Sequence, residues 1–128
     1  MATNSMAGYL DIKVIDIEDS FITATMPVNE KTMQPMGILH GGASVVLAET
    51  LGSIGSALKL DLSKQAPVGL EINANHIRSV VKGKTVTGKA NIIHQGRKTH
   101  VWNIEIKDEM DKLVCVSRLT VAIIATKP

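Results

Sequence analysis

Alternation of apolar and polar residues predicts strands along most of this chain. Residues 9–17 start in phase at Leu10, Ile12 and Val14 and then slip, which predicts a strand with a bulge. A short turn leads to the β-branched run 21–26, so the two runs predict a hairpin. Four later runs, at about 68–79, 85–93, 99–107 and 113–124, are separated by short turns and predict an antiparallel meander.

Between residue 41 and about residue 58 the period becomes helical. Leu47, Leu51, Ile54 and Leu58 recur every three or four residues and define one stripe of a helix. The opposite face combines Glu49 with small residues that let another group approach the backbone, namely Gly42, Gly52, Ser53 and Ser56. Apolar residues also occur on that face, so we expect the helix to be covered on most sides. The element order predicts an α+β fold, a curved antiparallel sheet wrapped around one long central helix.

Composition limits the domain count and the location of the protein. With 128 residues, 45% of them hydrophobic, the chain predicts a single domain over residues 1–128. The single cysteine, Cys115, lies in an apolar run and predicts a buried thiol in a reducing, cytoplasmic setting. No export signal is recognisable at the start, and no apolar run has the roughly 20 residues that a membrane helix needs.

Charge and aromatic content argue against nucleic-acid partners. The net charge is only +2, and the chain has one Tyr, one Trp and one Phe, too few for a base-stacking platform. One segment is nevertheless basic and free of acidic residues, and it contains Arg78, Lys82, Lys84, Lys89, Arg97 and Lys98. This segment predicts either a local anion site or a solvated sheet edge that discourages strand pairing.

Glu49 is the strongest candidate for chemistry, because it interrupts a helix that otherwise reads as buried. A carboxylate in such a position is either a base or nucleophile in a pocket or part of a solvated stripe. The small residues near it, Gly52, Ser53 and Ser56, favour the pocket, since a solvated stripe would carry Lys, Glu or Gln instead.

The helix start carries His40, Gly41 and Gly42, where unpaired N–H groups and the helix dipole would stabilise an oxyanion or a polarised carbonyl. The alternative is an ordinary glycine entry turn. Glu49 follows Gly41 by eight residues, about 12 Å along a helix axis. One atom cannot touch both within a chain, so either the helix start bends back or a second subunit supplies one of them.

Two residues near the end of a predicted strand suggest a phosphate site. His76 and Arg78 share a strand face with Leu70, Ile72 and Ala74 and precede the basic segment. A capped strand end with solvated tips is the alternative. The four histidines have no metal-ligand spacing, and neither a Gly-x-Ser-x-Gly motif nor a phosphate loop is present.

Residues 34–50 and 69–79 together resemble the two signature stretches of the hotdog-fold acyl-CoA thioesterases, in the branch with a glutamate on the helix. Members of that branch hydrolyse aromatic acyl-CoA esters such as 1,4-dihydroxy-2-naphthoyl-, gentisyl- or 4-hydroxybenzoyl-CoA. The resemblance implies that Glu49 is the nucleophile or general base and that the Gly41 N–H polarises the thioester carbonyl. It also implies that Gln34 lies near that carbonyl or the water, and that His40 and Ser53 position the leaving thiolate, the carboxylate or the water.

The same resemblance implies further properties. The coenzyme A contacts would be Gly69, His76, Ile77, Arg78, Ser79, His94, Gln95, Gly96, Arg97, Lys98 and Thr99. No metal or redox cofactor is implied, and coenzyme A is part of the substrate. The resemblance also implies a homodimer that assembles into a homotetramer, with the active site at a subunit interface. The pathway that it suggests is menaquinone biosynthesis. Two other functions stay open: a hotdog dehydratase or hydratase acting on acyl thioesters, and a non-catalytic acyl-CoA-binding module.

Overall fold

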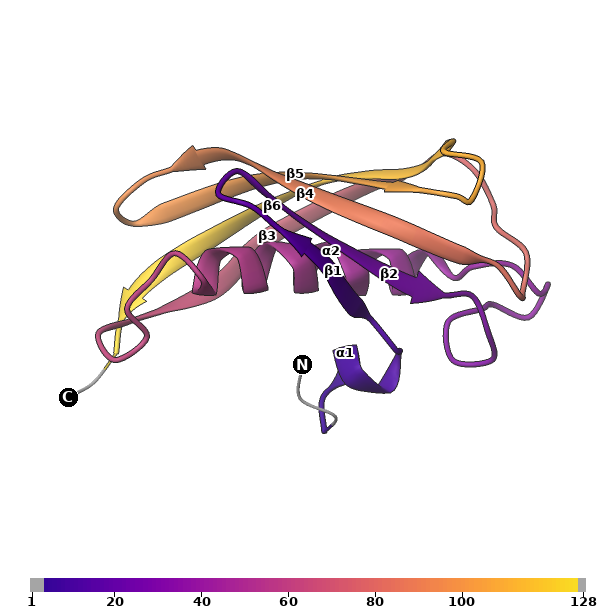
Figure 1. Cartoon of the computed structure of the whole chain (residues 1–128), viewed down its shortest axis with the longest axis horizontal. Helices are drawn as coiled ribbons and strands as arrows, with labels where there is room; N and C mark the ends of the chain where they lie inside the picture. The colour runs from indigo at the N-terminus through magenta and orange to yellow at the C-terminus, as the bar shows by residue number, and fades with distance from the viewer. Residues whose placement is uncertain (1–3, 127–128) are drawn as a thin grey trace.

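The computed structural model describes residues 4–126, which form one six-stranded sheet and one long helix. The elements are α1 (Met6–Tyr9), β1 (Lys13–Ile17), β2 (Phe21–Pro27), α2 (Gly41–Ala57), β3 (Gln65–His76), β4 (Thr85–Gln95), β5 (Thr99–Lys107) and β6 (Leu113–Ala125). All strand pairs are antiparallel, in the order β1-β2-β4-β5-β6-β3. The sheet arches over α2, while α1 lies apart from the sheet (Figure 1). The predicted α+β architecture is confirmed.

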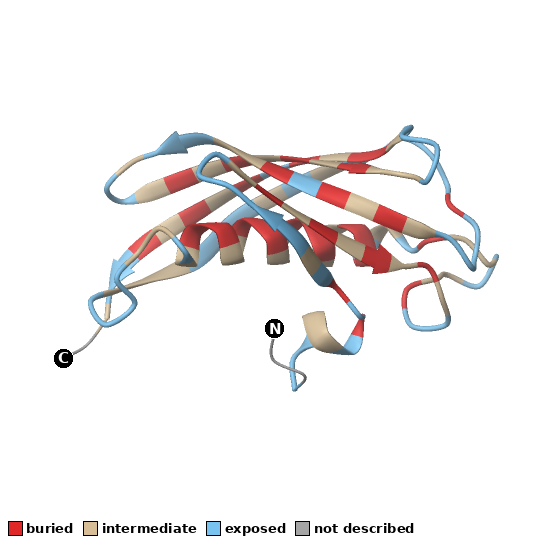
Figure 2. Ribbon diagram, viewed as in Figure 1, coloured by how far each residue is buried: buried red, intermediate tan, exposed pale blue. Residues whose placement is uncertain are grey.

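The core lies between the concave face of the sheet and α2. Alternate residues of β2 and β5 are buried, which gives the banded ribbons of Figure 2. In β5 the inward residues are His100, Trp102, Ile104 and Ile106, as the alternation predicts. A fully buried aliphatic side chain stabilises the fold by roughly 2 kcal/mol relative to exposure, so these strands hold the helix in place.

Small residues in the second half of α2 accept side chains from the sheet. A Cβ on Gly55 would lie 2.6 Å from the Trp102 ring, and one on Gly52 would lie 2.4 Å from Leu119 Cδ2. Next to them, Trp102 Nε1 donates to Ser56 Oγ at 2.8 Å, and Ser56 Oγ lies 2.8 Å from His100 Nδ1. The groups that approach Gly52 and Ser56 are therefore parts of this chain's own core.

Burial is the main reason that the pKa of His100 is lowered, and the charges of Lys59 and His94 lower it further. A neutral imidazole accepts a hydrogen bond at one ring nitrogen. The Ser56 hydroxyl, which already accepts from Trp102, can therefore donate to His100 Nδ1, so that Trp102 Nε1, Ser56 Oγ and His100 Nδ1 each have a partner.

The strand β3 departs from the predicted meander. It pairs with β6 and ends the sheet, while residues 77–84 carry the chain back to β4. A bulge between Gly69 and Glu71 shifts the register, so Leu70 is 62% exposed rather than on the apolar face predicted for it. The reason is topological: only a long connection lets β3 reach the far edge, and turn composition does not reveal that choice.

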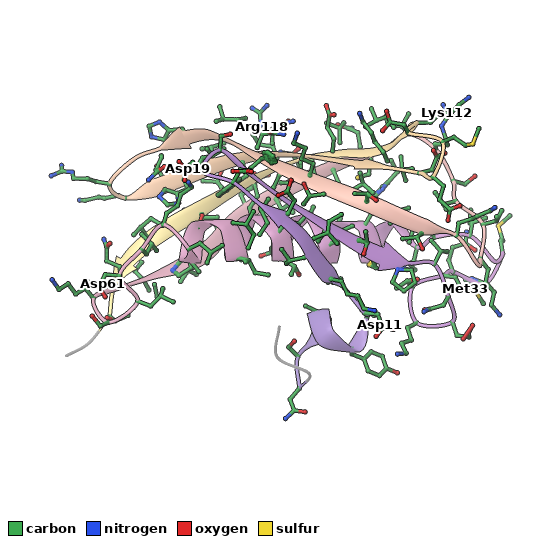
Figure 3. All side chains as sticks on the ribbon, viewed as in Figure 1. Asp11, Asp19, Met33, Asp61, Lys112 and Arg118 are labelled. Carbon is green, nitrogen blue, oxygen red and sulfur yellow. The ribbon has the colours of Figure 1, made fainter. Side chains whose placement is uncertain are left out.

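One side of α2 is not covered by the sheet. Val45, Val46, Glu49 and Ser53 are only half-buried, and Leu58, predicted to continue the apolar stripe, is 58% exposed. Coverage on most sides is therefore not seen within a single chain. The loop with Met33 and the turn with Lys112 lie at one end of the molecule, and Asp61 lies at the other (Figure 3).

The first predicted strand begins later than expected. Residues 6–9 form the helical turn α1, whose N-cap Ser5 accepts a hydrogen bond from Gly8 N. Asp11, with φ of 59°, ends the turn before β1 begins. The bulge predicted in the strand is confirmed, because the β1–β2 register shifts between Val14 and Asp16.

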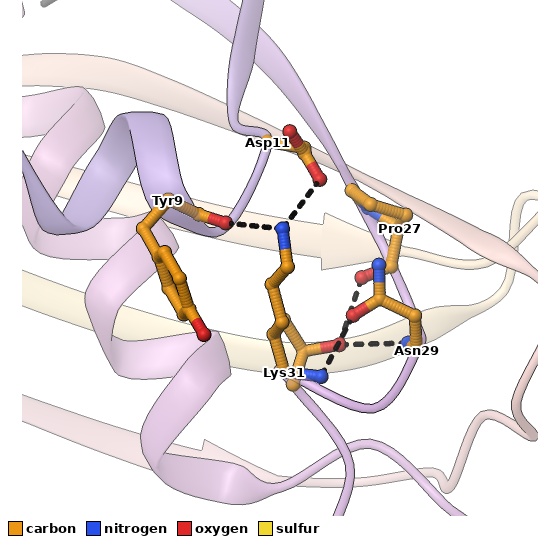
Figure 4. Close-up of polar contacts among 6 residues, drawn as sticks. Tyr9, Asp11, Pro27, Asn29 and Lys31 are labelled. Atoms are coloured by element: carbon orange, nitrogen blue, oxygen red, sulfur yellow. Dashed lines mark hydrogen bonds and ion pairs between the residues drawn. The ribbon is translucent and has the colours of Figure 1, made fainter. Parts of the chain in front are cut away.

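Lys31 ties α1 to the loop after β2 (Figure 4). Its Nζ donates to the Tyr9 carbonyl at 3.0 Å, lies 3.5 Å from Asp11 Oδ2 and sits 4.7 Å from the Tyr9 ring centroid. Exposed ion pairs of this kind contribute less than about 1 kcal/mol each. Within residues 4–126, neither helix is long and apolar enough to cross a membrane.

Candidate active site

The first turn of α2 leaves one backbone donor available. His40 is the N-cap, and its Nδ1 accepts from Gly42 N at 2.8 Å. The His40 carbonyl accepts from Ala43 N at 3.0 Å and from Ser44 N at 3.3 Å. Among the described residues, the Gly41 N–H has no acceptor. A free N–H at the positive end of a helix dipole is suited to an oxyanion.

His76 covers Gly41 from the end of β3. A Cβ on Gly41 would lie 2.8 Å from His76 Nε2, so only glycine lets the imidazole come this close to the helix start. Around the two residues is a cavity of about 340 Å³. Six of the predicted site residues line it, namely Gln34, Gly41, His76, Ile77, Arg78 and Ser79.

Gln34 reaches this cavity from a turn in the loop before α2. Its backbone N donates to Ile38 O at 2.8 Å, its carbonyl accepts from Gly37 N at 2.9 Å, and its side-chain Oε1 accepts from Met36 N. Gly37 has a φ of 80°, which favours glycine. Bonds from Leu39 N to Val80 O and from Lys82 N to Gly37 O join this loop to residues 77–84.

Acidic residues from another loop lie close to the basic segment in space. Backbone donors are the main reason that the pKa of Asp108 is lowered, chiefly the Lys112 N–H, and the charge of Arg78 lowers it further. Glu109 also approaches this segment, since its Oε2 accepts from Thr85 N at 2.8 Å. The basic segment contains no acidic residue of its own, but Asp108 and Glu109 lie next to it in the fold.

Glu49 lies apart from this cavity, about two helical turns further along α2. Its carboxylate makes no hydrogen bond or ion pair with the part of the chain that the structure describes. It faces Gly69 on β3, where a Cβ would lie 2.6 Å from Glu49 Oε2. Ser53 follows Glu49 by one helical turn and is half-buried. The separation expected from helix geometry is therefore present in the folded chain.

The other predicted coenzyme A residues lie at the opposite end of the strands from His76. Gly69 pairs with Val121, Val121 with His100, and His100 with Gln95. His94 and Gln95 end β4, and the turn to Thr99 is closed by Gly96 N donating to Thr99 O at 2.8 Å and exposes Arg97 and Lys98. Seven residues separate Gly69 from His76, roughly 20 Å along a strand.

The predicted site residues therefore form two separate groups in the chain. We call the cavity group of Gln34, Gly41, His76, Ile77, Arg78 and Ser79 the amide end, and Glu49 with Gly69 the carboxylate end. Sequence reasoning missed Ser44 and Val114, which also line the cavity of the amide end. Ser44 follows the glycine pair and could have been found from the helix period, whereas Val114 is brought there only by the pairing of β3 with β6.

Residues 4–126 contain no cluster of three or more His, Cys, Asp or Glu side chains that could hold a metal ion. Cys115 is buried, as predicted, and burial raises the pKa of its thiol. The amide end can stabilise negative charge on an oxygen, and the carboxylate end supplies an unpaired base or nucleophile. This combination is suited to acyl transfer.

Comparison with known proteins agrees with that chemistry. The family model of the thioesterase superfamily matches residues 36–115. The 1,4-dihydroxy-2-naphthoyl-CoA hydrolase of Escherichia coli is 51% identical over 124 residues, covering 97% of this chain and 90% of the relative. A proofreading thioesterase of Cronobacter sakazakii is 43% identical over 123 residues, covering 96% and 88%.

The fold agrees as well. The crystal structure of a mutant thioesterase from Pseudomonas aeruginosa superposes with a TM-score of 0.93 at 48% identity, covering 97% of this chain and 88% of that one. Sequence and fold match over nearly the full length of each protein. The chain therefore belongs to the thioesterase superfamily and is a thioester hydrolase with the hotdog fold.

Proposed function

We propose that this enzyme hydrolyses acyl-CoA thioesters, with the Gly41 N–H polarising the carbonyl and Glu49 acting as nucleophile or general base. The observation that carries the proposal is that the Gly41 N–H has no acceptor among the described residues, while Gly41 lines a cavity together with Gln34, His76 and Arg78. An N–H donor there lowers the barrier by stabilising the oxygen as it becomes negative.

The bond changes are the same overall for both roles of Glu49. As a base, the carboxylate takes a proton from water while the water oxygen adds to the carbonyl carbon; the C–S bond then breaks and the thiolate leaves. As a nucleophile, the carboxylate adds first and expels the thiolate, and water then hydrolyses the mixed anhydride. Either path yields a free acid and CoA, and each requires ionised Glu49.

The active site is assembled from two copies in this proposal. The outer edge of β3 has no partner strand within the described residues, and Val68 and Leu70 on β3 are 44% and 62% exposed. Antiparallel pairing of this edge with a second copy, about a two-fold axis between Ile72 and Asn73, would bring Gly69 of one strand opposite His76 of the other. That arrangement joins the carboxylate end of one chain to the amide end of its partner.

The same pairing supports the coenzyme A assignment. Arg78 lies at the amide end, while Arg97 and Lys98 lie at the opposite end of the strands and would come from the second copy. Guanidinium and ammonium groups from both sides would bind the phosphates of the nucleotide. A homotetramer built from two such dimers, with no metal or redox cofactor, completes the proposed assembly, and the buried Cys115 thiol suits a reducing cytoplasm.

For the acyl group we propose an aromatic acid. The Escherichia coli relative is named a hydrolase of 1,4-dihydroxy-2-naphthoyl-CoA, and a second relative of that name, from Listeria monocytogenes, is 46% identical over 114 residues. We therefore place 1,4-dihydroxy-2-naphthoyl-CoA first among the substrates, with gentisyl- and 4-hydroxybenzoyl-CoA next, and menaquinone biosynthesis as the pathway.

A thiol-release assay over aryl-, short- and long-chain acyl-CoAs tests this function. We expect fastest release from the aryl esters, and Glu49→Gln to lower turnover by about two or more orders of magnitude while it still binds CoA. Full turnover in Glu49→Gln would remove Glu49 from the mechanism. Hydration of an enoyl-CoA without free thiol would indicate the dehydratase class instead, and tight binding without any release would indicate a binding module.

A further inference from the structure

Gly69 is a glycine that its own φ does not require, although it borders the bulge in β3. It lies inside β3, opposite Val121 of β6, and its φ is outside the left-handed region, which within residues 4–126 holds only Gly37 and Gly83 among the glycines. Glycine weakens a strand interior because it has more freedom to lose and no side chain to pack. The reason for this residue therefore lies in the space over its Cα.

That space is occupied by the Glu49 side chain. A Cβ on Gly69 would lie 2.6 Å from Glu49 Oε2, 3.6 Å from Glu49 Cδ and 4.0 Å from Leu119 Cδ1. Real Cβ atoms essentially never come within 3.0 Å of a heavy atom outside their own residue and its chain neighbours. With any other residue at position 69, the carboxylate would have to move or rotate.

Among the described residues, no hydrogen bond or ion pair fixes the carboxylate. The Glu49 Oε2 atom instead occupies the space that a Cβ on residue 69 would need, so the missing side chain of Gly69 is what admits the carboxylate there. The contrast is Gly88 of β4, where a Cβ would lie 2.8 Å from Leu51 Cδ1 and 3.2 Å from Leu47 Cδ2. Gly88 makes room for apolar core, whereas Gly69 makes room for an ionisable oxygen.

We propose that Gly69 is a positioning residue for Glu49, and that its missing side chain sets where the carboxylate lies relative to the thioester. The proposal rests on the proposed function of Glu49. It differs from the role implied by the resemblance, a direct contact with coenzyme A. The bulge that follows Gly69 directs Leu70 outward and keeps that larger side chain away from the carboxylate.

Gly69→Ala tests the proposal through the split between kcat and KM. A displacement of about 1 Å at a reacting group lowers the rate by up to about 100-fold. We expect Gly69→Ala to lower kcat by 10-fold or more, with KM for an acyl-CoA changed less than twofold, and to lower kcat equally for the corresponding N-acetylcysteamine thioester. A raised KM for the CoA ester alone, with kcat unchanged, would overturn the proposal.

The effect of Gly69→Ala can also be compared between the wild-type enzyme and a variant with a shorter acid, Glu49→Asp. Asp withdraws the carboxylate by one methylene, so Gly69→Ala should change kcat less than twofold when it is added to Glu49→Asp. Gly88→Ala is the control for general overpacking and should lower kcat by the same factor in both backgrounds. A similar loss from Gly69→Ala in the wild-type and Glu49→Asp backgrounds would overturn the positioning role.

Thermal unfolding tests the packing without any activity. Gly69→Ala removes a strand glycine in both backgrounds, so it should raise the melting temperature more in Glu49→Ala, where the space over residue 69 is vacant, than in the wild type, where the carboxylate must rotate away. Equal shifts in both backgrounds would refute the contact, even if Gly69→Ala alone unfolds too readily for kinetics. Normal turnover in Glu49→Gln overturns the function of Glu49, whereas normal turnover in Gly69→Ala, together with an inactive Glu49→Gln, overturns only the role of Gly69.

Discussion

Both halves of α2 contain small residues, but in the second half these pack against the sheet, whereas the first half carries polar groups without a partner among the described residues. In the second half, Leu119 packs over Gly52 and Trp102 packs over Gly55. Ser56 forms hydrogen bonds with Trp102 and His100. In the first half, the Gly41 N–H and the Glu49 carboxylate have no partner within residues 4–126. Glycine and serine content alone therefore does not distinguish a segment packed against the sheet from one with unpartnered polar groups.

The largest effect is expected from an experiment that inactivates the carboxylate end in one chain and the amide end in another. Glu49→Gln inactivates the carboxylate end, and Gly41→Ala disrupts the amide end, because its Cβ would lie 2.8 Å from His76 Nε2. Each variant alone should lose about 100-fold or more in turnover.

Mixed and refolded together, the two variants should recover about a quarter of wild-type activity, because half of the dimers pair unlike chains and each of those has one intact site of two. The measurement is thiol release from an aryl-CoA after co-refolding. No recovery, with mixed dimers verified by mass spectrometry, would mean that both ends act within one chain.

A smaller effect is expected from the basic residues that lie at opposite ends of the strands. Arg78→Ala and Arg97→Ala should each raise KM for a CoA ester by about 10-fold, as expected for the loss of a charge-assisted hydrogen bond. Neither should affect a thioester that lacks the nucleotide. Steady-state kinetics with both substrates checks this, and equal changes for the two substrates would discard the phosphate assignment.

The second half of the helix should respond in stability rather than in chemistry. Ser56→Ala leaves Trp102 Nε1 and His100 Nδ1 without their shared partner. A buried polar group without a partner costs about 1–3 kcal/mol, so the melting temperature should fall by several degrees. Calorimetry checks the shift, and an unchanged melting temperature would show that the network contributes little.

The smallest effect is the pH dependence of that network. Burial lowers the pKa of His100 in the folded state from the ordinary value of 6.5, so below that value the unfolded chain takes up a proton that the folded chain does not. Stability from His100 is therefore present above about pH 6.5 and is lost as the pH falls toward the folded-state pKa. Melting temperatures between pH 7.5 and 5 should fall less steeply in His100→Gln, and parallel slopes would contradict the assignment.

Local patterns predicted most of the fold, and long-range pairing supplied the rest. The period of Leu47 and Leu51 and the alternation along β5 are local, and the structure confirms both. The place of β3 at the sheet edge depends on a connection whose residues carry no signal for it. The strand predicted from residue 9 begins only at Lys13, because Tyr9 ends a helical turn, capped at Ser5, that is too short to show a helical period.

The candidate site divides in the same way. Glu49 and Gly41 could be chosen from helix position and residue type, and their separation follows from the rise of a helix. The cavity that gathers Gln34, His76 and Arg78 depends on hydrogen bonds between residues 28–40 and 77–84, which no single stretch of sequence predicts. Contact between Gly69 and Glu49 likewise requires the three-dimensional register of β3 over α2.

The open edge of β3 has a consequence for how much working enzyme a cell obtains from a given amount of protein. Within residues 4–126 the outer edge of this 12-residue strand has no partner strand, so it offers a template to another extended chain. If turnover needs two copies, as proposed above, output at low expression rises with the square of the chain concentration. Doubling synthesis would then quadruple the rate until most chains are paired.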